Sequence, residues 1–154
     1  MVDWTADLGT TPARILDEPE CAKLISTQRL GRIATTRHAL PIIIPVVYGC
    51  LDEDIIFRVS SGILQRAASD AHVVCFQTDH AGDSNFQSSW SVSVIGSLSL
   101  LKDPLKLIAA RELPLGPWNA DTFIALKGSL YSGRSLGSSP TDHASSAPGS
   151  PADR

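Results

Sequence analysis

The stretch FRVSSGILQRAA, residues 57–68, joins the end of a strand to the start of a helix. The strand is predicted to end at Phe57 and Arg58, and two serines and a glycine precede an apolar helical segment. A serine cap would leave the first helical N–H groups free to face an anion, and the Arg58 guanidinium suits a phosphate. The stretch therefore indicates an anion site. The alternative is a strand–helix corner whose arginines are ordinary surface charges.

The segments on either side are predicted as short strands and short helices. Asp17 is the predicted N-cap of the first helix, and Gly96, in the middle of a long strand, predicts a β-bulge or a close backbone approach. Six short strands with turn signals favour a closed or partly closed barrel. The fold class is α+β, mainly antiparallel β. The predicted helices span 17–28, 62–70 and 103–115, and the predicted strands span 29–37, 40–50, 55–60, 72–79, 90–101 and 121–136.

A single folded domain is predicted between two segments of lower order. Residues 1–16 form a loose N-terminal segment, and residues 17–136 form the domain. Residues 137–154 are rich in Ser, Pro, Ala and Gly, and they have few large apolar side chains to offset the entropy of ordering. This tail is therefore expected to be disordered.

Composition excludes several classes of protein. The formal net charge of −3 argues against a nucleic-acid-binding protein, which usually presents a basic face. Three cysteines without CxxC spacing indicate reduced thiols and a cytoplasmic location. The longest apolar run, around residues 42–47, is too short to span a membrane, and no signal pattern begins the chain. The histidines show no metal-ligand spacing, so no metal site is expected.

Seven motifs in a fixed order connect the predicted elements to a known family. They are LGRIATT, LPIIIPVVY, DEDIIFRVSSG followed by LQRAA, VVCFQTD, WSVSVIGSLSLLKDP, LPLGPW and YSGR. In this order they resemble the pyridoxamine 5′-phosphate oxidase-like FMN-binding split-barrel family, and within it the small actinobacterial flavin- and nucleotide-binding branch. The resemblance covers roughly residues 17–136.

The resemblance implies a six-stranded Greek-key split barrel with short flanking helices. It also implies a homodimer whose two cofactor sites lie at the interface. The usual ligand is flavin mononucleotide (FMN), and relatives bind a deazaflavin, flavin adenine dinucleotide (FAD) or haem. The implied activity is that of an FMN-dependent oxidoreductase with an unidentified small-molecule substrate. No general base is evident, which fits chemistry supplied by a cofactor.

The resemblance further implies cofactor contacts for particular residues, each with a structural alternative. For the threonine, proline and valine positions, the alternative is ordinary packing within a strand. For the tryptophan, the alternative is an anchor in the core or at an interface, and for the arginines it is a solvated surface charge. The positions near the ring are Arg32, Thr35, Thr36, Pro45 and Val46; those near the phosphate are Arg58, Ser60, Ser61, Gly62 and Arg66; those near the dimer seam are Trp90 and Arg134.

The phosphate site departs from the family pattern at one position. A Gly-Thr-Lys or Gly-Arg-Lys run is expected there, whereas this chain has Gly62, Ile63 and Leu64. Loss of a charged hydrogen bond would weaken phosphate binding by ~10- to ~100-fold, and Arg66 is expected to compensate from one turn later. The alternative is a non-catalytic module that carries flavin, deazaflavin or haem, or a cofactor-free structural dimer.

Overall fold

The computed structural model describes residues 14–117 and 120–136. The predicted tail, the first thirteen residues and the two residues after Pro117 lie outside the described residues. The described chain contains these elements in order: β1 (Arg14–Leu16), α1 (Glu18–Ile25), β2 (Leu30–Arg37), β3 (Leu40–Leu51), β4 (Asp54–Val59), α2 (Ile63–Ser69), β5 (Val73–His80), β6 (Trp90–Leu100), α3 (Pro104–Arg111) and β7 (Thr122–Ser135).

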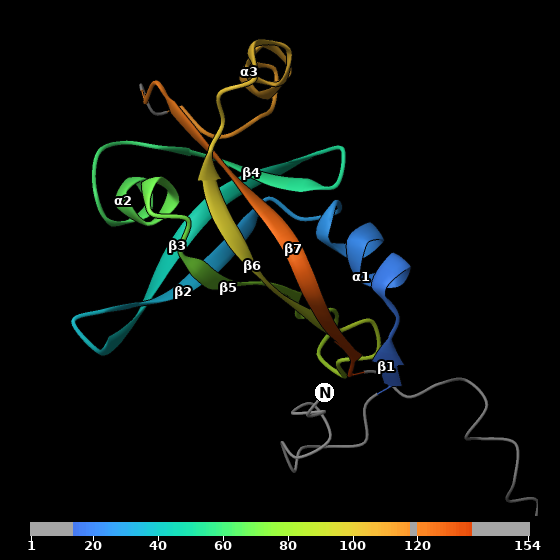
Figure 1. The fold of residues 1–154 in the computed structure, drawn as a ribbon. Coiled ribbons are helices and arrows are strands. Elements are labelled where there is room, and N and C mark those ends of the chain that lie inside the picture. The colour runs from blue at the N-terminus through green and yellow to red at the C-terminus, as the bar shows by residue number, and fades with distance from the viewer. Residues whose placement is uncertain (1–13, 118–119, 137–154) are drawn as a thin grey trace, which may run out of the picture.

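Six of the strands form a closed antiparallel barrel, as the sequence predicted. The strand order is β7-β4-β3-β2-β5-β6, and β6 pairs again with β7 to complete the ring (Figure 1). Strands β2, β3 and β4 follow one another as hairpins, and β5 returns to lie beside β2. This order defines a Greek key, so the mainly antiparallel split-barrel fold is confirmed.

The ends of the helices and the first strand differ from the prediction. The structure places a three-residue strand, β1, in the segment expected to be loose, and it pairs with the end of β7. Helix α1 begins at the predicted cap, because Asp17 Oδ1 accepts a hydrogen bond from the Glu20 N–H at 2.9 Å. The helix ends at Ile25, earlier than predicted, where two hydroxyl side chains bond its last carbonyls.

The barrel interior is apolar and contains a cluster of aromatic rings. Tyr48 and Phe76 meet edge to face with ring centroids 4.8 Å apart, and Phe57 packs against Phe76 at 5.7 Å. The Tyr48 hydroxyl donates to the Ile25 carbonyl at 2.6 Å, and burial raises the pKa of Tyr48 to about 12. The phenol therefore stays protonated and links the barrel wall to the end of α1.

The barrel closes through a β-bulge at the predicted glycine. Ile95 pairs with Leu130, whereas the next residue, Gly96, pairs with Gly128, so Ser129 is left over on β7. The Ser129 hydroxyl donates to the Ile95 carbonyl at 3.1 Å. The bulge increases the local bend of β7, which pairs with β4 at one end and with β1 at the other. None of the helices in the described part is long and apolar enough to cross a bilayer.

Candidate functional site

A pocket of about 690 Å³ opens where strands β3 and β4 separate. The two strands pair only from Tyr48 and Phe57 towards their connecting turn, so residues 44–47 have β2 as their neighbour but not β4. The β4–α2 connection and Ala120 close the other side. The lining residues are Ile44, Pro45, Val46, Val47, Arg58, Val59, Ser60, Ser61, Gly62, Ile63, Leu64 and Ala120.

The sequence explains why the strands separate at this point. Pro45 has no N–H group, so β3 cannot offer a complete ladder to another strand there. Side chains alternate across β3: Val46 faces the barrel core, whereas Pro45 faces outward. Because the strand edge is free, side chains from both faces border the opening, and they give it an apolar wall.

Arg58 supplies the one charged side chain among the described residues of the lining. Its neighbour Phe57 points into the core, so the alternation of the strand turns Arg58 outward. The Arg58 Nε–H donates to the Ala120 carbonyl, and the guanidinium lies 5.7 Å from the centre of the Phe123 ring. These contacts fix the guanidinium at the pocket wall, and the two Nη groups are the part of its fork that a ligand anion can engage.

The start of α2 differs from the prediction of a serine cap. The N-cap is Gly62, with φ of 152°, and no side chain accepts a hydrogen bond from the first helical N–H groups. Ser60 and Ser61 are exposed and precede the cap, so their hydroxyls line the pocket instead. A positive φ is available to glycine at little cost, which accounts for glycine rather than serine at the cap position.

Leu64 occupies a place between the pocket and the core. Only 8% of its surface is exposed, and it belongs to the main cluster of buried side chains together with Ala67 and Ala68 from the same helix. The position where the family pattern has lysine is therefore an apolar anchor for α2 in this chain. Ile63 precedes it, is half-buried and also lines the pocket.

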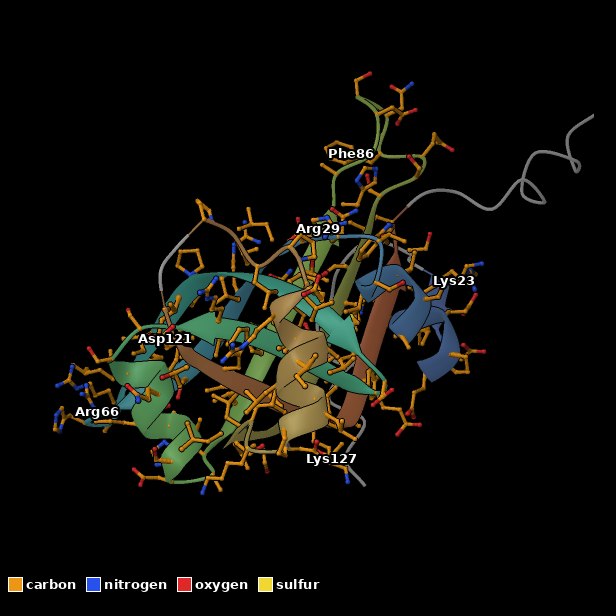
Figure 2. The ribbon with its side chains drawn as sticks, turned by 90° about the horizontal axis from the view of Figure 1, so that it is seen from above. Lys23, Arg29, Arg66, Phe86, Asp121 and Lys127 are labelled. Atoms are coloured by element: carbon orange, nitrogen blue, oxygen red, sulfur yellow. The ribbon has the colours of Figure 1, made fainter. Side chains whose placement is uncertain are left out.

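Several predicted residues lie outside this lining. Arg32 is adjacent to Pro45 across the β2–β3 ladder, but its Nη1 donates to Asp79 Oδ1 at 3.0 Å. Thr35 and Thr36 follow on β2 and face opposite sides of the sheet, so they cannot both contact one ligand face. Arg66 is exposed on the outer side of α2 (Figure 2).

The two residues predicted near the dimer seam also lie outside the pocket lining. Trp90 is 8% exposed, belongs to the core cluster and stacks on His80, with ring centroids 6.3 Å apart. Arg134 lies near the far end of β7 from Ala120 and is paired in register with Ser91. The structure therefore brings together Pro45, Val46, Arg58 and the Ser60–Gly62 segment, and it does not bring together the rest of the predicted set.

The sequence analysis missed three of the apolar lining residues, namely Ile44, Val59 and Ala120. Ile44 and Val59 flank predicted positions on β3 and β4, but the alternation of side chains along a strand would assign such neighbours to the core or to solvent. Ala120 precedes β7 and carries no chemical signal of its own. The available signal was Pro45, because a proline within a strand indicates a free edge.

A second hollow, of about 520 Å³, lies between α1, the β3–β4 turn and β7. Among the described residues, its lining contains the carboxylates of Glu18, Asp52, Glu53 and Asp54 and one cation, Lys127. Like charges disfavour an anionic ligand there. The first pocket, whose described lining holds an arginine and no carboxylate, is therefore the candidate site for a phosphorylated ligand. Among residues 14–117 and 120–136, no group of three or more metal-ligating side chains gathers.

Comparison with known proteins places most of the chain in one family. The family model described as pyridoxamine 5′-phosphate oxidase matches residues 17–135. The chain is 30% identical over 125 residues to the "uncharacterized protein Rv0080" of Mycobacterium tuberculosis, a match that covers 77% of this chain and 82% of that protein.

Solved structures share the fold over most of the chain. The structure of an FAD-binding protein from Mycobacterium smegmatis is 27% identical, with a TM-score of 0.66 over 80% of this chain and 97% of that chain. An FAD- and haem-binding protein from the same organism is 18% identical, with a TM-score of 0.61 over 82% and 74% of the two chains, a likeness of fold alone.

A closed antiparallel barrel of six strands, flanked by three short helices among the described residues, is the architecture of the split-barrel class. The extent of the family match identifies the chain within that class. It belongs to the pyridoxamine 5′-phosphate oxidase-like FMN-binding split-barrel family.

Proposed function

We propose that this chain binds a flavin, with FMN as the preferred form, and acts as a flavin-dependent oxidoreductase on a small molecule. The observation that carries the proposal is the pocket itself. It has an apolar wall from β3 on one side and Arg58 with two serines on the other, in a chain of this family. Its volume lies within the range of roughly 300–1,000 Å³ that is usual for cofactor sites.

The residues present fit the two parts of such a cofactor. Pro45, Val46 and Ile63 offer apolar surface to a planar ring, which excludes water from it. Arg58 and the hydroxyls of Ser60 and Ser61 offer donors to a phosphate. The bound flavin would supply hydride transfer. Within the described lining no carboxylate, histidine or lysine is present as a proton donor or acceptor.

We also propose that the protein is a cytoplasmic homodimer with its sites at the interface. The outer face of the barrel carries a row of apolar side chains that are adjacent in the ladders across five strands. A row of this kind is poorly suited to water and indicates a covered surface. Its members are Ile43, Ala34, Cys75, Ile95 and Leu130. Ile43, with 69% of its surface exposed, is the most accessible of the large residues.

The proposed function is tested by titrating cofactor-free protein with FMN, riboflavin and FAD while flavin fluorescence is recorded. We expect FMN to bind with a micromolar or lower Kd and riboflavin to bind more weakly. Loss of the flavin absorbance at about 450 nm on adding a nicotinamide reductant would distinguish an oxidoreductase from a carrier. If none of the three flavins binds, the flavin-binding proposal is wrong, and haem, a deazaflavin or no cofactor takes its place.

Arg58→Ala is expected to weaken FMN binding selectively. A hydrogen bond to a charged group contributes roughly 1.5–3 kcal/mol, so Kd for FMN should rise about 10- to 100-fold while Kd for riboflavin changes little. Arg66→Ala is the matched control: Arg66 is an exposed arginine outside the pocket lining, and we expect a change within about 2-fold. Equal losses of FMN and riboflavin in Arg58→Ala would mean that Arg58 only supports the pocket wall through Ala120.

A further inference from the structure

Phe86 is an aromatic side chain that the fold presents to solvent. It is 57% exposed, and it is the only exposed Phe, Tyr or Trp among residues 14–117 and 120–136. It lies in the loop between β5 and β6, which stands away from the barrel (Figure 2). Exposure of a phenyl ring to this extent is unfavourable in water, so a covering surface would stabilise it.

The loop holds Phe86 in one conformation. Asp83 Oδ1 accepts hydrogen bonds from the backbone N–H groups of Asn85 at 3.2 Å and Gln87 at 3.0 Å, and the Asp83 carbonyl accepts from the Phe86 N–H at 3.0 Å. The φ angle of Phe86 is 57°, a left-handed value that is an outlier for a bulky side chain. The loop is therefore ordered in a way that keeps the ring outside.

Phe86 cannot reach the pocket of its own chain. The base of its loop is attached to the end of β7, because the Leu136 N–H donates to the Ser89 carbonyl at 2.8 Å. The pocket borders Ala120, just before the other end of β7, which runs for 14 residues. Figure 2 shows the same separation, with Phe86 on the projecting loop and Asp121 on a different side of the barrel.

We propose that Phe86 of one protomer covers the pocket of its partner and so completes the flavin site. The pocket mouth offers apolar surface from Ile63 and Val47, which suits a phenyl ring. Before a phosphate binds, the two surfaces also carry opposite charge: Asp83 is the one charged side chain of the loop, and Arg58 is the one charged side chain of the described lining. Trp90, predicted near the dimer seam, is buried in its own core, and Phe86 is the exposed aromatic residue of the same hairpin.

This inference depends on the proposed function, namely a homodimer that binds flavin. The first experiment tests the geometry without any flavin. Two chains, one with Phe86→Cys and one with Ser61→Cys, are mixed in a background of Cys50→Ala and Cys75→Ala and treated with a short bis-maleimide. We expect a cross-linked heterodimer from this pair. The control pair, Phe86→Cys with Ser26→Cys, should give none, since Ser26 is also exposed but lies at the end of α1, outside the pocket lining.

The second experiment measures the effect on ligand binding. Phe86→Ser is expected to raise Kd about 10-fold for FMN and riboflavin alike, because the ring contacts the flavin and not its phosphate. The control variant is Leu105→Ser, which removes an apolar residue of α3 that is 78% exposed. It should leave the Kd values for FMN and riboflavin unchanged. Phe86→Gly should also weaken binding while raising the melting temperature, because glycine tolerates the left-handed backbone.

The outcomes separate the inference from the function on which it rests. A dimer by sedimentation that binds flavin, but gives no cross-link and keeps its affinity in Phe86→Ser, overturns the role of Phe86 alone. A monomer that binds flavin overturns both the homodimer and the role of Phe86. Failure of the wild-type chain to bind any flavin refutes the flavin proposal, and the cross-link then still decides whether Phe86 meets the partner's pocket.

Discussion

Leu64→Lys should lower the stability of the protein by about 2–4 kcal/mol, because it places an ammonium where the core needs an apolar side chain. Leu64 is 8% exposed and packs with Ala67 and Ala68 beneath α2. Lysine can retain part of this packing with its four-carbon stem, but its charge must lose water or turn towards the pocket. Urea denaturation of the ligand-free protein measures the loss.

The same variant tests whether the pocket holds a phosphate. If the introduced ammonium turns into the pocket, FMN should restore more stability than riboflavin does, because only FMN has a phosphate to pair with it. Leu64→Met keeps the volume and should cost less than about 1.5 kcal/mol. A Leu64→Lys protein as stable as the wild type, with tighter FMN binding, would show that leucine merely removed a phosphate contact and has no role as an anchor.

Much of the barrel could be predicted because its signals are local. Val92, Val94 and Leu98 lie at alternating positions of one strand, so their side chains point to the same face, and all three are fully buried in the structure. The capping position of Asp17 and the bulge at Gly96 also followed from single residue types. Strand β1 could not be predicted, since three residues have no periodicity and their pairing depends on the distant end of β7.

The pocket was only partly predictable, since it depends on how two strands diverge. Arg58 and the serines were found from chemistry, whereas Ala120 enters the site only through the path of the chain before β7. The alternation of side chains along a strand could have corrected two of the expectations. Trp90 alternates along β6 with the buried valines Val92 and Val94, so its side chain points to the same face, the core. Thr35 and Thr36 are consecutive and therefore face opposite sides of the sheet.

Gly96→Ala should destabilise the protein by more than about 3 kcal/mol, because the barrel closes at this residue through backbone contact. A Cβ atom at Gly96 would lie 2.1 Å from the Lys127 carbonyl oxygen and 3.0 Å from the Gly128 Cα. Both neighbours are backbone atoms, so relief requires β6 and β7 to move apart. The bulge between these strands would then be lost, and with it the bend that lets β7 pair with both β4 and β1.

Gly49→Ala provides the matched control for this steric effect. A Cβ there would meet the Leu113 side chain at 3.1 Å, and a flexible side chain can move by a few tenths of an ångström. We therefore expect a change within about 1 kcal/mol, of either sign, since alanine also reduces the entropy of the unfolded chain. Thermal unfolding of both variants measures the difference. Equal stability of Gly96→Ala and Gly49→Ala would contradict the close contact at the bulge and would mean that the two strands can separate there without cost to the barrel.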